Sequence, residues 1–263
     1  MKYTPREVKG NVNISRTSPI KEFFLLLGGT LAVVLVIYAG LGLAVDLIVP
    51  KVPVEIEQHL GRFYSEAYEN ANQTTEAARL QRLLEELVRE LPEDERRYRV
   101  YVVPNSKENA LALPGGNILV FSDLIEEAES ENELAFVLAH ELGHFANRDH
   151  LRGFGRRLVL VTISAALLGQ DSSITEFLMN SLLTVEMKFS QHQEKAADLW
   201  ALDLLNKKYG EVAGATDFLE RIVQEEKRGR FSYYFATHPH PQGRVKALEE
   251  HIKREGYLTK KSL

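Results

Sequence analysis

An uncharged apolar segment of 23 residues, Phe23 to Val45, constrains this chain more than any other feature of its sequence. A helix of that length reaches about 34 Å and can cross a hydrocarbon core of about 30 Å. The apolar region of a cleaved signal peptide is shorter, about 7–15 residues. The segment therefore favours an uncleaved transmembrane anchor, over residues 23–49, that contacts the lipid bilayer.

The charges on either side of this segment predict its orientation. Residues 1–22 contain five basic and two acidic residues, a net charge of +3, whereas Asp46 to Glu57 contain three acidic residues and one basic residue. The positive-inside rule then keeps residues 1–22 in the cytoplasm and exports a domain of residues 50–263. In a bacterium that domain would face the periplasm from the inner membrane, and an organelle inner membrane is the alternative.

A second apolar run of 12 residues, Leu158 to Gly169, is too short to span a membrane. We expect it to form a buried core helix. Three arginines before it, Arg152, Arg156 and Arg157, leave a position in the membrane interface as the alternative.

Composition excludes several classes of protein. The 263 residues include no cysteine, which rules out a disulfide framework, an iron–sulfur cluster and a thiol nucleophile. A net charge of −5 argues against a nucleic-acid partner, because phosphate binding needs a basic face.

The exported part has an α+β pattern. Two helical patterns occupy residues 54–91, the second from Thr74 to Leu91. A strand is predicted at Tyr98 to Val103, and a hairpin at Asn109 to Leu113 and Asn117 to Phe121 around a Pro-Gly-Gly turn. The rest is helical, so we expect a mostly helical domain with a small sheet.

One helix carries a metal-binding motif. Ser130 and Glu133 form an S-x-x-E capping box that opens a helix at about Glu131. His140 and His144, four residues apart, share a helical face and can bind one metal ion. Glu141 lies about 100° around the helix, from where it could take a proton from a water molecule activated by the metal.

Two histidines do not complete a zinc site, since catalytic zinc takes three protein ligands. Glu194 and Asp198 are four residues apart on a helix expected from about Thr184 to Asn206. One could bind the metal while the other orients an imidazole ligand. The other candidates for the third ligand are His150, His192, His238 and His240.

These motifs carry a family resemblance. In order they are the sequence NALALPGG at 109–116, HELGH at 140–144, E-x-x-x-D at 194–198, and Thr237-His238-Pro239 followed by Arg244. The chain thereby resembles the HtpX and CAAX-prenyl-protease group of membrane-associated zinc metallopeptidases, peptidase family M48, over residues 60–250. The resemblance implies a gluzincin-like zincin fold.

The resemblance also implies roles for individual residues. His140, His144 and Glu194 would bind one zinc ion, Glu141 would be the catalytic base, and Asp198 would support His140. The family often has Ser-Arg shortly before the glutamate ligand, whereas this chain has Ser190-Gln191. That difference puts a local ion pair in doubt but leaves the metal site intact, and we expect His192 nearby to lie on the surface.

Further roles remain open at the sequence level. In the resembling family the histidine at the His238 position lies near the zinc, where it can stabilise an oxyanion or bind the metal as a self-inhibitory ligand. Arg244 could pair with a substrate or with a carboxylate near the site. The strand containing Asn109, Ala110, Leu111 and Ala112 could bind an extended peptide through its edge, or be an ordinary core strand.

These observations predict a membrane-anchored zinc metalloendopeptidase that hydrolyses membrane-proximal or misfolded proteins. The alternative is a metal-binding chaperone or assembly factor, with proteolysis minor or blocked by His238.

Overall fold

The computed structural model describes residues 18–69, 73–92, 96–104, 109–183, 189–226, 237–239 and 241–259. The chain divides into two compact units, residues 1–41 and 42–263. The first unit contains most of helix α1 (Pro19–Ile48), whose apolar side chains are largely exposed. Among the described residues, α1 with the turn that follows it is the helix long and apolar enough to cross a membrane.

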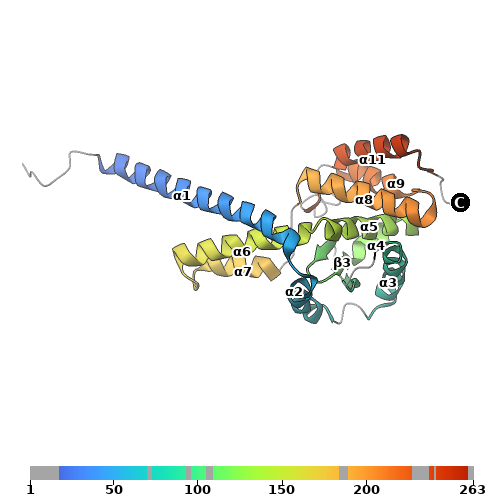
Figure 1. The fold of residues 1–263 in the computed structure, drawn as a ribbon, viewed down its shortest axis with the longest axis horizontal. Coiled ribbons are helices and arrows are strands. Elements are labelled where there is room, and N and C mark those ends of the chain that lie inside the picture. Colours follow the sequence, from blue (N-terminus) through green and yellow to red (C-terminus); the bar gives the residue numbers. More distant parts are fainter. Residues whose placement is uncertain are drawn as a thin grey trace, which may run out of the picture. The chain divides into compact units, whose positions relative to one another are not determined.

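The second unit begins with the end of α1 and the short helix η1 (Val49–Lys51), and its remaining elements are drawn in Figure 1. Its helices are α2 (Val54–Ala67), α3 (Thr75–Val88), α4 (Ser122–Glu127), α5 (Glu131–Ala146), α6 (Asp149–Leu168), α7 (Ser173–Leu183), α8 (Gln191–Tyr209), α9 (Ala215–Glu226) and α11 (Pro241–Glu255). Its strands are β1 (Arg99–Val103), β2 (Ala110–Leu113) and β3 (Asn117–Phe121). The expected α+β class, mostly helical with a small sheet, is confirmed.

The three strands form one sheet in the order β1-β3-β2. β2 and β3 are the predicted antiparallel hairpin, with Leu113 opposite Asn117. Gly115 and Gly116 both have positive φ, +83° and +79°, in the turn that joins them, a conformation that side chains disfavour. β1 pairs with β3 in parallel, with Arg99 opposite Asn117.

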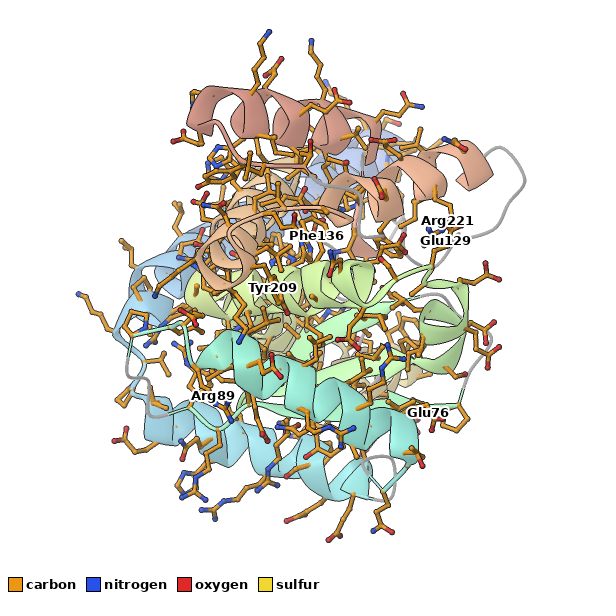
Figure 2. All side chains as sticks on the ribbon, turned by 90° about the vertical axis from the view of Figure 1, so that its right-hand side faces the viewer. Glu76, Arg89, Glu129, Phe136, Tyr209 and Arg221 are labelled. Carbon is orange, nitrogen blue, oxygen red and sulfur yellow. The ribbon has the colours of Figure 1, made fainter. Side chains whose placement is uncertain are left out.

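The sheet separates two apolar clusters. The larger one fills the space between the sheet, α3, α5, α8, α9 and α11, and the smaller one lies on the opposite face with Tyr64 and Phe189. α5 is buried continuously from Glu133 to Phe145 because it lies between the sheet and α8, as Figure 1 shows. Figure 2 views this part of the molecule from the side, with Phe136 of α5 inside it and Tyr209 at the end of α8.

The predicted capping box at Ser130 forms only in part. Ser130 Oγ accepts from the Glu133 N–H at 3.3 Å, but the Glu133 carboxylate does not return the bond. It accepts instead from the Glu129 N–H and from the guanidinium of Arg221, which lies beside Glu129 in Figure 2. The reciprocal half of the capping box is therefore absent, because an arginine competes for the carboxylate.

The helix that carries Glu194 does not begin at about Thr184, as predicted. Phe189 and Ser190 are not helical, and α8 begins at Gln191, where Ser190 and Gln193 form a complete capping box. The predicted first turn, 184–188, lies outside the described residues.

The prediction of a buried core helix at Leu158 to Gly169 is wrong. This run forms the second half of α6, in which Val161 and Ser164 are the buried residues. Leu167 is 58% exposed and Leu168 54% exposed. The apolar run is thus mostly on the outside of the domain.

Candidate metal centre

The close approach of α5 and α8 builds the site. A Cβ added at Gly143 of α5 would lie 2.9 Å from both Cα and the carbonyl oxygen of Ala197 of α8, closer than side chains tolerate. The glycine therefore lets the two backbones touch. As a result, Glu194 of α8 faces His140 and His144 of α5.

Four buried side chains converge at this contact: His140, His144, Glu194 and His238. Their candidate ligand atoms lie within 4.8 Å of one another. His140 Nε2 is 3.1 Å from His144 Nε2 and 3.3 Å from His238 Nδ1. Glu194 Oε1 is 3.5 Å from His144 Nε2 and 3.1 Å from His238 Nδ1.

These separations fit a metal ion. A tetrahedral ion with bonds of about 2.0–2.1 Å holds its ligand atoms roughly 3.3 Å apart. Each of the four side chains is at most 2% exposed. Two imidazole nitrogens that face each other in a dry site, beside a carboxylate, are arranged as ligands to a shared cation.

Each histidine of α5 has a carboxylate behind it. Asp198 Oδ1 is 2.8 Å from His140 Nδ1, and Asp149 Oδ2 is 3.1 Å from His144 Nδ1. Such contacts orient the ring and place the proton on Nδ1, which leaves Nε2 to bind the metal. Asp149 was not among the residues predicted from the sequence. Its signal is weak: an aspartate five residues after His144, at the start of the next helix.

Arg244 lies among the carboxylates of the site. Its Nε and Nη2 each donate to Asp198 at 2.7 Å, and its Nη1 is 2.7 Å from Glu194 Oε2. The side chain is 3% exposed, so of the two partners considered for it the structure favours the buried carboxylates over a substrate.

The surroundings control the charge of the candidate ligands. Burial alone would raise the pKa of Glu194, but the charges of His238 and Arg244 hold this pKa well below its usual value. Burial alone would lower the pKa of His144, but hydrogen bonds to Asp149 and Glu194 raise it to about 10. The same negative charges that attract this proton would attract a metal ion to the same nitrogen.

Glu141 lies beside the cluster without joining it. The side chain is 1% exposed, and its Oε1 is 3.8 Å from His238 Nε2. Within the described part of the chain, its Oε2 has no hydrogen-bond partner. A buried carboxylate oxygen without a partner is costly, so a group that the structure does not contain is expected to meet it.

His238 belongs to the short described segment 237–239, which strand β2 holds in place. Asn109 Nδ2 donates to Thr237 Oγ1 at 3.1 Å, and His238 Nε2 is 3.3 Å from the Ala110 carbonyl. β2 is an edge strand, and Ala110, Leu111 and Ala112 are all buried. The His238 segment thus covers the start of this edge, for which peptide binding and an ordinary core role were the two alternatives.

Of the other histidines that were considered, two are described by the structure and both lie outside the cluster. His192 is exposed, as expected, and His150 is buried against Glu57 at 2.8 Å. His240 lies outside the described residues. A contact that sequence reasoning missed is Phe189, whose ring stacks on His144 at 3.8 Å between centroids.

Comparison with known proteins adds an independent finding. A sequence model described as peptidase family M48 matches residues 74–252. Mitochondrial metalloendopeptidase OMA1 of Schizosaccharomyces pombe is 30% identical over 168 residues, which cover 60% of this chain and 49% of that protein. Metalloprotease LoiP of Escherichia coli is 30% identical over 165 residues, which cover 60% of this chain and 64% of that protein. Metalloprotease YcaL of the same organism is 29% identical over 161 residues, which cover 59% of this chain and 61% of that protein. The chain therefore matches less than two-thirds of the length of each of these relatives.

Proposed function

Because the chain belongs to peptidase family M48, we propose that it is a membrane-anchored zinc metalloendopeptidase that hydrolyses peptide bonds of other proteins. One observation carries the proposal: His140, His144, Glu194 and His238 bring their ligand atoms within 4.8 Å of one another beside Glu141. Imidazole and carboxylate ligands suit zinc, and an open fourth position would make the site catalytic.

We assign the zinc to His140, His144 and Glu194, with Asp149 and Asp198 orienting the two imidazoles. When bound, zinc would polarise the scissile carbonyl and make a water molecule more acidic. Glu141 would take a proton from the attacking water and deliver it to the leaving amine. No covalent intermediate is required, which agrees with the lack of cysteine.

His238 has two possible roles in this proposal. With its Nδ1 3.3 Å from His140 Nε2, it can occupy the fourth position and keep the enzyme latent. Moved aside but kept near, its ring could instead donate a hydrogen bond to the developing oxyanion. Opening of the segment that contains Thr237 and His238 would also expose the edge of β2, to which an extended substrate could add as a strand.

The flanking charges support an orientation with residues 1–22 in the cytoplasm and the peptidase domain exported. In a bacterium the substrates would then be membrane-proximal or misfolded proteins of the periplasm. An organelle inner membrane is the alternative setting, and one of the relatives is a mitochondrial protein.

The test uses the full chain in detergent with casein as substrate and zinc content measured on the same sample. The wild type should cleave casein, lose activity to a chelator and regain it with zinc. Glu141→Gln should keep its zinc and lose at least 100-fold in rate, whereas Glu249→Gln, at an exposed site, should match the wild type.

The same assay separates the competing functions. If the wild type is inactive and His238→Ala is active, the site is latched by His238. If the wild type, Glu141→Gln and His238→Ala all bind zinc but cleave nothing, the proposal fails. A metal-binding chaperone or assembly factor then becomes the better hypothesis for the function.

A further inference from the structure

The hairpin formed by α6 and α7, which projects from the rest of the second unit in Figure 1, has the reverse of the polarity expected in water. Where the helices meet, the buried hydroxyls of Ser164 and Thr175 lie 2.8 Å apart, and Thr175 also donates to the Gly169 carbonyl. Six large apolar side chains of the hairpin, beside exposed polar ones such as Thr162, Glu176 and Asn180, are 46% to 70% exposed: Leu158, Leu167, Leu168, Ile174, Phe177 and Met179. A hairpin in water would bury these side chains and expose the hydroxyls.

The hairpin also carries little charge. Residues 158–183 contain two charged residues, Asp171 in the connecting loop and Glu176, and no basic residue. An isolated exposed leucine needs no explanation, but six large exposed apolar side chains on two packed helices indicate an interaction site. Hydroxyl contacts between helices, with apolar side chains outside, are typical of helices packed in lipid.

The base of the hairpin is joined to the end of the membrane anchor. Asp46, in the last turn of α1, pairs with Arg156 of α6 at 2.8 Å and lies 3.8 Å from Arg152. Val45 packs on Gly155 so closely that a Cβ at Gly155 would lie 2.9 Å from it. Because residues 45 and 46 end the apolar segment, an α1 that spans the bilayer would place the base of α6 at the membrane surface.

We propose that the α6–α7 hairpin is a second membrane-contacting element, which inserts the apolar side chains around Leu168 and Phe177 into the interface of the bilayer that α1 crosses. The apolar half of α6 has 11 residues, about 16 Å, too short to span the membrane. Penetration of about 5–10 Å is the ordinary depth of an interfacial helix. The hairpin would fix the tilt of the peptidase domain against the membrane.

The partner is lipid rather than a protein because the hairpin's base is tied to the anchor, so the membrane is always within reach. The lack of basic residues in 158–183 predicts that insertion depends on apolar contact and not on anionic lipid. This inference stands whether or not the chain is an active peptidase.

The test exploits the absence of cysteine, which makes any introduced cysteine a unique labelling site. Phe177→Cys and Leu168→Cys, each at an exposed position, carry an environment-sensitive fluorophore in the full chain reconstituted in phosphatidylcholine vesicles. Two controls receive the same label: Tyr209→Cys, 40% exposed at the end of α8, and Glu55→Cys, exposed just after the anchor. Circular dichroism melting curves, compared with that of the wild type, establish which of the four variants are folded.

Labels at residues 177 and 168 should be quenched several-fold more by lipids with a nitroxide on the acyl chain than labels at 209 and 55. Adding the anionic lipid phosphatidylglycerol should leave the ratio of quenching at 177 and 168 to quenching at 209 and 55 unchanged. Quenching no greater than at residues 209 and 55 would overturn the proposal. So would a label at 177 that is shielded from aqueous iodide yet not quenched by nitroxide lipid, since a second copy or another protein would then cover the hairpin. If Leu168→Cys fails to fold, Phe177→Cys, the more exposed position, decides alone.

Discussion

Replacement of Asp149 by asparagine should weaken zinc binding without unfolding the chain. In the wild type, Asp149 Oδ2 accepts from His144 Nδ1 at 3.1 Å and Oδ1 accepts from Gln193 Nε2 at 2.8 Å. Gln193 cannot rotate its amide, because its Oε1 already accepts from the Ser190 N–H and hydroxyl, both at 2.9 Å. The oxygen of an asparagine at 149 must therefore face Gln193, and its NH₂ group must face His144.

That arrangement reverses the tautomer of His144. With a donor in front of Nδ1, the imidazole proton moves to Nε2, the atom that faces the proposed metal. Removal of a carboxylate behind a histidine ligand typically costs 10–100-fold in metal affinity, about 1.4–2.8 kcal/mol. We expect Asp149→Asn to lose that much, at the upper end because Gln193 prevents the asparagine from turning round.

The assay is competition for zinc against a chromophoric chelator, with thermal melting measured on the same samples. The control is Asp203→Asn, which alters another aspartate–histidine pair, with His251 at 2.8 Å; Asp203 lies on α8, the helix that carries Glu194, but outside the cluster. It should bind zinc like the wild type. A folded Asp149→Asn with an affinity within threefold of the wild type would refute the tautomer argument.

Two further predictions concern the packing around the site. Gly143→Ala should lower the free energy of unfolding by about 1–3 kcal/mol and reduce zinc content, because the new methyl group pushes the α8 backbone at Ala197 away. A denaturant titration measures this loss, and Gly243→Ala, with open space around it, is the control. Glu57→Gln should lower the free energy of unfolding by about 1.5–3 kcal/mol at pH 7, because the buried Glu57 carboxylate is 2.8 Å from His150 Nε2. Burial opposes ionisation, but contacts with His150 and nearby arginines lower the pKa of Glu57 below 4.5, so this carboxylate stabilises the fold above that pH. Urea titrations give the free energy of unfolding, and its difference between the wild type and Glu57→Gln should shrink as the pH falls below about 4.5. A difference that stays constant would contradict the stabilising role of the ionised Glu57 carboxylate.

Local chemistry in the sequence predicted the local structure well. The β2–β3 hairpin follows from two apolar runs around a Pro-Gly-Gly turn, and the two glycines adopt the positive φ that the turn requires. The parallel pairing of β1 with β3 was not predictable in this way. It joins segments with no turn between them, and it depends on the apolar cluster that covers the sheet.

In the site, too, the residues that follow from local sequence could be predicted, whereas those that depend on contacts between distant segments could not. The spacing of His140 and His144 follows from helix geometry, whereas Glu194 needed the family resemblance, because a four-residue acidic spacing is common on exposed helices. Asp149 was missed because a reversal of the chain brings it back to His144. That reversal occurs at Arg148, a residue with a left-handed φ of 56°. Hydrogen bonds from Arg148 Nη1 to the carbonyls of Val49 and Val52 hold it, and no local pattern reveals them.

The error at residues 158–169 has a different origin. The expectation of a buried helix assumed that water surrounds every part of the exported domain, so that an apolar run must face a core. Asp46 holds the start of α6 beside the end of an apolar helix, and if that helix crosses a membrane the surrounding solvent changes there from water to lipid. In lipid, an apolar surface exposed at that position would cost little, and the Ser164–Thr175 contact would gain from the exclusion of water. If the bilayer covers this surface, the rule that apolar side chains leave water still holds, and the error lay in the choice of solvent.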